Sequence, residues 1–165
     1  MANEHLATYL NDHLAGSVVA LELMEHLEAA HAGTALESFL SELRADVAED
    51  RRELEALMSR LQVAESRTRK ATAWVTEKIT EVKLRLDDPA GGALRLMEAL
   101  EALSLGIEGK RSMWRALATV AEEADRLSVV DYERLTARAE EQRSRVEEER
   151  LKAAKAALGD FEQAI

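Results

Sequence analysis

The chain has 165 residues and a formal net charge of −10, which argues against nucleic acid as a partner because phosphate contacts need clustered lysine and arginine. It has no cysteine, which excludes disulfides and thiolate sites and favours a cytoplasmic location. We expect neither a transmembrane helix nor a signal peptide, because no run of about 18 apolar residues is present and the amino terminus lacks a basic start before an apolar centre.

The composition favours an all-α protein, because alanine, leucine, glutamate and arginine are abundant and there is only one proline. Helical periodicity predicts helices over about residues 4–31, 35–62, 68–86, 92–124 and 129–158. Gly33 and the Thr34-x-x-Glu37 capping box separate the first two helices. Ser128 and Asp131 have the same capping-box spacing before the last helix. We therefore expect a single domain, an antiparallel four-helix bundle of two long hairpins joined by a long, partly helical crossover.

Apolar residues at steps of three and four mark an inward face on each of the four long helices, and polar residues interrupt it near mid-helix. On the third helix the interruption consists of Lys110 and Arg111. Counting residues from the two hairpin loops brings the interruptions of all four helices to nearly the same level. We therefore predict a polar layer in the core. Its members are His13, Ser17, Asp50, Arg111 and Arg143.

The order of hairpin, long crossover and hairpin, over nearly the whole chain, resembles the ferritin-like superfamily. Metal-binding members hold two iron or manganese ions at mid-bundle with inward glutamates and Glu-x-x-His pairs. The resemblance therefore implies a di-metal site at the level of the predicted layer. That layer has one carboxylate and two guanidiniums, which cannot bind a metal. We predict instead a buried ion pair of Asp50 with Arg111 or Arg143, and no bound cofactor.

One literal Glu-x-x-His pair, Glu28 with His31, faces inward in the last turn of the first helix. It lies far from mid-bundle, and the helix dipole accounts for a histidine at that end. A single pair also falls short of the three or four ligands of a stable site. Glu28 and His31 remain the candidate metal ligands. An iron or manganese oxidase, peroxidase or iron-handling protein with atypical ligands is therefore the alternative function.

The segment Arg67–Leu86 is basic and carries an apolar stripe that includes Trp74, Val75, Ile79 and Val82. The stripe fits a crossover helix laid on the acidic bundle. It also fits an interfacial helix that docks on anionic lipid, which makes a peripheral membrane stress protein a further alternative.

Several apolar residues are predicted to face away from the core, which suggests cover by the crossover or a homodimer interface. They are Val18, Val19, Leu23, Leu105 and Met113. The sequence contains no nucleophile with a matched base and no glycine-rich phosphate loop. We therefore predict a non-catalytic bundle with a structural or protein-interaction role.

Overall fold

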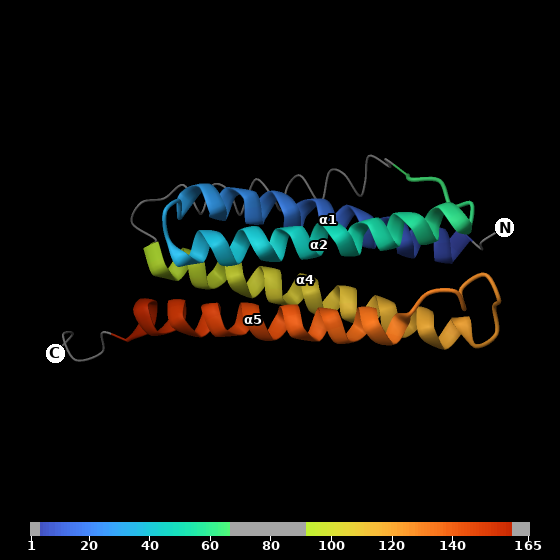
Figure 1. Ribbon diagram of the computed structural model, residues 1–165. Coiled ribbons are helices and arrows are strands. Elements are labelled where there is room, and N and C mark those ends of the chain that lie inside the picture. Colours follow the sequence, from blue (N-terminus) through green and yellow to red (C-terminus); the bar gives the residue numbers. More distant parts are fainter. Residues whose placement is uncertain (1–3, 67–91, 160–165) are drawn as a thin grey trace.

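The computed structural model describes residues 4–66 and 92–159, and within these ranges the only regular secondary structure is helical (Figure 1). The helices are α1 (Glu4–Ala30), α2 (Ala35–Arg60), α4 (Gly92–Ala121) and α5 (Tyr132–Leu158). Each begins and ends within three residues of its predicted bounds, so the all-helical fold is confirmed for the described part. The predicted helix over 68–86 lies outside the described residues, as do Trp74, Val75, Ile79 and Val82.

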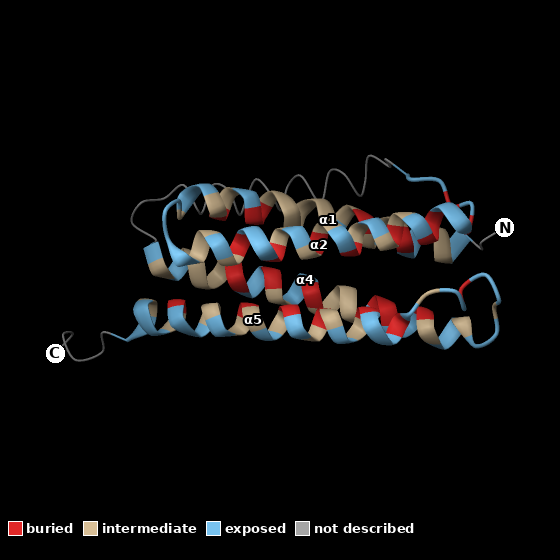
Figure 2. Cartoon of the chain, in the orientation of Figure 1, coloured by how far each residue is buried: buried red, intermediate tan, exposed pale blue. Residues whose placement is uncertain are grey.

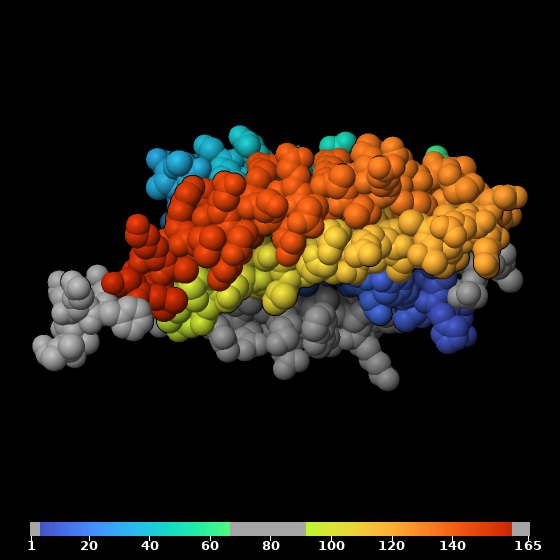
Figure 3. All heavy atoms as spheres, turned by 90° about the horizontal axis from the view of Figure 1, so that it is seen from below, coloured from blue at the N-terminus to red at the C-terminus, as the bar shows by residue number. Residues whose placement is uncertain are grey.

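The four helices form a bundle in which α1 packs along α2 and α4 packs along α5. The two pairs meet where α1 contacts α4 and where α2 contacts α5. Figure 3 shows α4 and α5 side by side along one face of the molecule. Buried positions recur along all four helices, as Figure 2 shows. They belong to two apolar clusters, one around Leu54, Trp114 and Leu135 and the other around Leu40, Leu100 and Val146.

The turn between α1 and α2 follows the sequence signals in part. Gly33 has φ +80°, the left-handed conformation expected of a glycine that ends a helix. The Glu37 carboxylate accepts a hydrogen bond of 2.6 Å from the backbone N–H of Gly33. The Thr34 hydroxyl donates to the carbonyl oxygen of His31 and makes no cap to α2. The predicted capping box therefore does not form, because Glu37 accepts from Gly33 rather than from the backbone N–H of the N-cap residue Thr34.

The start of α5 was predicted three residues too early. The Asp131 carboxylate is the N-cap and accepts a 2.9 Å hydrogen bond from the backbone N–H of Arg134. Ser128 instead donates from its hydroxyl to the carbonyl oxygen of Asp125. Leu127 in this connection is buried against the core. The chain therefore makes a further turn, with Leu127 inserted into the core, before the helix begins.

The prediction that Leu23 and Met113 face away from the core is wrong, because both are buried. The helix α1 contacts both α2 and α4, so its buried arc is wider than one stripe at steps of three and four. Leu105 does face solvent, with 74% of its surface exposed, whereas Val18 and Val19 are half-buried.

Candidate functional site

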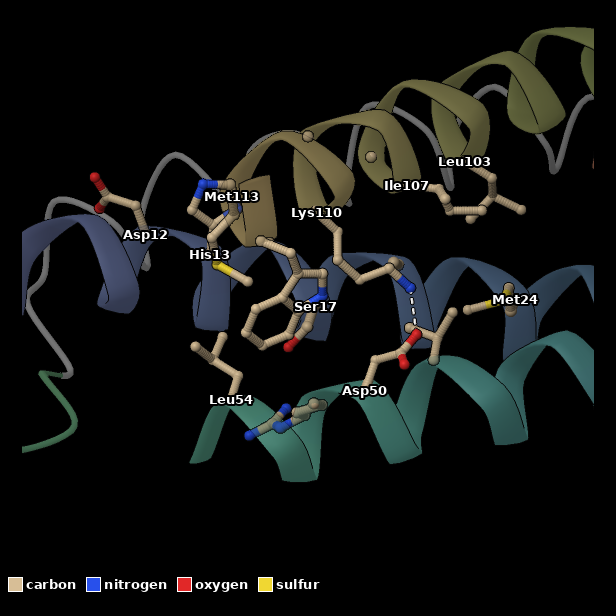
Figure 4. A pocket seen from close by; sticks show the side chains of 17 residues that line it. Asp12, His13, Ser17, Met24, Asp50, Leu54, Leu103, Ile107, Lys110 and Met113 are labelled. Carbon is tan, nitrogen blue, oxygen red and sulfur yellow. Dashed lines mark hydrogen bonds and ion pairs between the residues drawn. The ribbon is translucent and has the colours of Figure 1, made fainter. Parts of the chain in front are cut away.

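The centre of the bundle holds a hydrogen-bonded ring of three side chains from three helices. Asp50 on α2 is only 3% exposed. Its Oδ2 accepts a hydrogen bond from Nζ of Lys110 on α4 and another, of 2.8 Å, from Nε2 of Gln142 on α5. Lys110 Nζ also donates to Gln142 Oε1, which closes the ring. Figure 4 shows the Lys110 side chain extending toward Asp50. The ring thus ties α2, α4 and α5 together between the two apolar clusters.

A second cation completes the surroundings of Asp50. Arg138 Nε lies 3.4 Å from Asp50 Oδ1, close enough for an ion pair, although Oδ1 accepts no hydrogen bond from the described residues. Arg138 also donates a 2.9 Å hydrogen bond to Glu49, the exposed neighbour of Asp50. A buried carboxylate without a partner would be costly, and two cations and an amide offset that cost here. Burial lowers the pKa of Lys110, and the neighbouring Asp50 opposes that shift.

The predicted pairing of Asp50 with Arg111 or Arg143 is wrong. Arg111 donates hydrogen bonds of 2.8 and 2.9 Å to Glu108, and Arg143 donates one of 2.8 Å to Glu140. A step of one residue turns an α-helix by about 100°. The side chain that faces Asp50 from α4 is therefore Lys110 rather than its neighbour Arg111. On α5 the corresponding side chain is Gln142 rather than Arg143.

His13 and Ser17 lie on α1 at the same level as Asp50, but neither joins the ring. The Ser17 hydroxyl donates a 2.6 Å hydrogen bond to the carbonyl oxygen of Leu14. The His13 ring packs edge-on against Tyr9, with the ring centroids 4.7 Å apart. Burial lowers the pKa of His13, and the nearby Asp12 partly opposes the shift. The predicted polar layer therefore divides into two parts. One is the hydrogen-bonded ring around Asp50, and the other consists of His13 and Ser17 on α1, which we call the α1 wall.

A cleft of about 350 Å³ separates that α1 wall from α4, with α2 beneath it. His13, Ser17, Asp50 and Lys110 all line it, together with mainly apolar side chains (Figure 4). Glycines at Gly16, Gly106 and Gly109 also line it. Sequence reasoning missed this cleft. The available signal was the run of small residues on α1 opposite glycines on α4.

The metal candidates have other partners. Glu28 accepts a 3.0 Å hydrogen bond from Arg44 Nε, and His31 Nδ1 lies 2.9 Å from the carbonyl oxygen of Leu27, to which it donates. Within residues 4–66 and 92–159, no group of three or more histidine, aspartate or glutamate side chains has an arrangement that could hold a metal ion.

No protein-family model, curated protein or solved structure matches the chain. None of the helices in the described ranges is both long and apolar enough to cross a membrane.

The ring of His13 should titrate below the ordinary histidine value of 6.5, because burial disfavours its charged form. Between the lowered pKa and pH 6.5, the unfolded chain binds more protons at His13 than the folded chain does. The free energy of unfolding is therefore unaffected by His13 above pH 6.5 and decreases as the pH falls from 6.5 toward the lowered pKa. An NMR titration of the ring protons measures the pKa directly. Asp12→Asn should lower the pKa further, since Asp12 raises it. A midpoint at or above the ordinary value would contradict the assignment.

Proposed function

We propose that the protein is a non-catalytic helical bundle of ferritin-like, antiparallel topology with a structural or protein-interaction role. The short connections between α1 and α2 and between α4 and α5, each joining helices that pack along one another, support two hairpins. The long stretch between α2 and α4 supports a crossover, as in ferritin-like bundles. The absence of cysteine from the sequence supports a cytoplasmic location.

The observation that carries this proposal is the pair of cations around Asp50. A ferritin-like di-metal centre needs several inward carboxylates at mid-bundle. Here Lys110 donates to the Asp50 carboxylate, and Arg138 lies beside it. A guanidinium stays protonated and offers no lone pair to a metal, and a protonated lysine offers none either. A divalent ion at Asp50 would therefore have to displace two positive charges, so we assign the ring a role in holding three helices together.

Metal loading tests the proposal. Purified protein is incubated anaerobically with iron(II) or manganese(II), desalted and analysed for metal content. We expect no stoichiometric metal, and Asp50→Asn should leave the result unchanged. About two ions per chain, lost in Asp50→Asn, would establish the di-metal alternative and overturn the proposal.

We also propose that the chain forms a homodimer, since several large apolar side chains are at least half exposed. The most exposed are Leu105, Val129, Leu151, Val120 and Leu158. Sedimentation equilibrium of the same sample measures the mass. A monomer at all concentrations would exclude the dimer without bearing on the ring at Asp50.

A further inference from the structure

The cleft between α1, α2 and α4 has the size of a small-molecule site. Such sites have volumes of about 300–1,000 Å³. At about 350 Å³ this cleft lies within the range of small-molecule sites. It lies at mid-bundle, beside the ring of Asp50, Lys110 and Gln142.

Glycines keep the cleft open from both sides. Gly16 is on α1, and Gly106 and Gly109 are on α4. No atom of the described residues lies within 4 Å of the place that a Cβ atom would occupy at any of the three. Their φ angles do not require glycine, and glycine disfavours a helix interior relative to alanine. Their effect on the structure is therefore to leave space where α1 and α4 face each other.

The walls of the cleft are apolar and adaptable. Met24 and Met113 line it together with Leu54, Leu103 and Ile107, and Figure 4 shows these side chains around the opening. Methionine is flexible and polarisable, so it fits ligands of irregular shape. Such a surface favours a ligand whose body is apolar.

A few polar groups on the walls have hydrogen-bonding capacity to spare. His13 makes a ring contact with Tyr9, and it forms no hydrogen bond with the other residues of 4–66 and 92–159. The Ser17 hydroxyl donates to Leu14 and can still accept. Trp114 also lines the cleft, but its Nε1 is itself buried and has no hydrogen-bond partner among the described residues. His13 and Ser17 would orient one polar group of a ligand.

Of the charged residues that line the cleft, Asp12 is exposed to solvent, and Asp50, Lys110 and Arg51 have ion-pair partners. Lys110 is paired with Asp50, and Arg51 is paired with Glu55 at 2.7 Å. An anionic ligand would lose its hydration and meet only cations that are already paired, and a cationic ligand would meet only the solvent-exposed Asp12 as a counter-ion, so a charge on the ligand is costly. We propose that the cleft binds an uncharged, largely apolar small molecule that carries one hydrogen-bonding group, oriented by His13 and Ser17. This site goes beyond the structural role and does not depend on it.

Fluorescence titration with N-phenyl-1-naphthylamine, an uncharged apolar probe with one N–H group, tests the proposal. The probe should show saturable enhancement at one site per chain, together with quenching of tryptophan emission, since Trp114 lines the cleft. At pH 8, decanol should displace the probe at least about tenfold more effectively than decanoate, whose charge would be desolvated. Absence of saturable binding, or stronger displacement by decanoate, would overturn the proposal.

Gly106→Leu fills the cleft from α4 and should weaken probe binding at least about tenfold without loss of helical content, because leucine favours a helix more than glycine does. Ala102→Leu is the matched control, since Ala102 is exposed on the same helix and does not line the cleft. A Gly16→Ala, Gly106→Ala double variant adds only two methyl groups and should raise the melting temperature while weakening binding. Unchanged binding in folded Gly106→Leu or in the double variant would place the probe elsewhere and overturn the proposal.

Discussion

Asp50→Ala should lower the free energy of unfolding by about 3–5 kcal/mol, the loss typical of removing one partner from a buried ion pair. The substitution leaves the Lys110 ammonium and the Gln142 amide near the bundle centre without their shared acceptor, Asp50 Oδ2. Arg138 loses the carboxylate that lies 3.4 Å from its Nε. Urea denaturation at pH 7, followed by far-UV circular dichroism, measures the change.

Two comparisons distinguish the loss of the ring's hydrogen bonds from the general effect of removing a negative charge. Glu49→Ala removes the adjacent carboxylate, which is exposed, and should change stability little because exposed ion pairs contribute little. A triple variant, Asp50→Leu with Lys110→Met and Gln142→Leu, should recover most of the loss, because well-packed apolar residues often replace buried ion pairs at no cost. If Asp50→Ala destabilises the protein no more than Glu49→Ala, the ring does not stabilise the fold.

The inward position of Asp50 could be predicted from the sequence, whereas its partners could not be chosen by charge. Buried residues on α2 recur at alternating steps of three and four, and Asp50 occupies one of these positions. The series is Leu40, Leu43, Val47, Asp50, Leu54 and Leu57. The same steps give Leu103, Ile107, Lys110, Trp114 and Leu117 on α4, and Leu135, Ala139, Gln142 and Val146 on α5. Continuing the steps of three and four therefore selects Lys110 on α4 and Gln142 on α5 as the partners of Asp50. The prediction chose the adjacent arginines, Arg111 and Arg143, because of their charge, and was wrong by one residue on each helix.

The cleft illustrates a different limit of sequence reasoning. Periodicity tells which face of a helix is buried, but the distance between two helices depends on side chains from both of them. The inward small residues Gly16 and Ser17 are visible in the sequence, as are Gly106 and Gly109. That they face one another across open space follows only from the packing of α1 and α4 above α2.

Trp114→Ala should lower the free energy of unfolding by about 3–5 kcal/mol, as large-to-small substitutions of buried aromatic residues do. Trp114 is 1% exposed and belongs to the apolar cluster that joins all four helices at one end of the bundle. Its ring lies 6.3 Å from that of Tyr132 on α5. Because it also lines the cleft, its removal enlarges a space that the neighbouring glycines already leave open. Chemical denaturation followed by circular dichroism avoids dependence on the lost fluorophore.

Trp114→Phe should cost much less than Trp114→Ala, because phenylalanine keeps a ring in the cluster and removes a buried N–H that has no acceptor within residues 4–66 and 92–159. An unsatisfied buried donor costs about 1–3 kcal/mol, which offsets part of the lost volume. Tyr132→Phe provides the matched control, since the Tyr132 hydroxyl is also buried without a partner in the described part of the chain and the substitution leaves the ring in place. It should be neutral or slightly stabilising. If both phenylalanine variants destabilise the protein as strongly as Trp114→Ala does, then Trp114 Nε1 and the Tyr132 hydroxyl have hydrogen-bond partners in solution. That result would contradict this prediction.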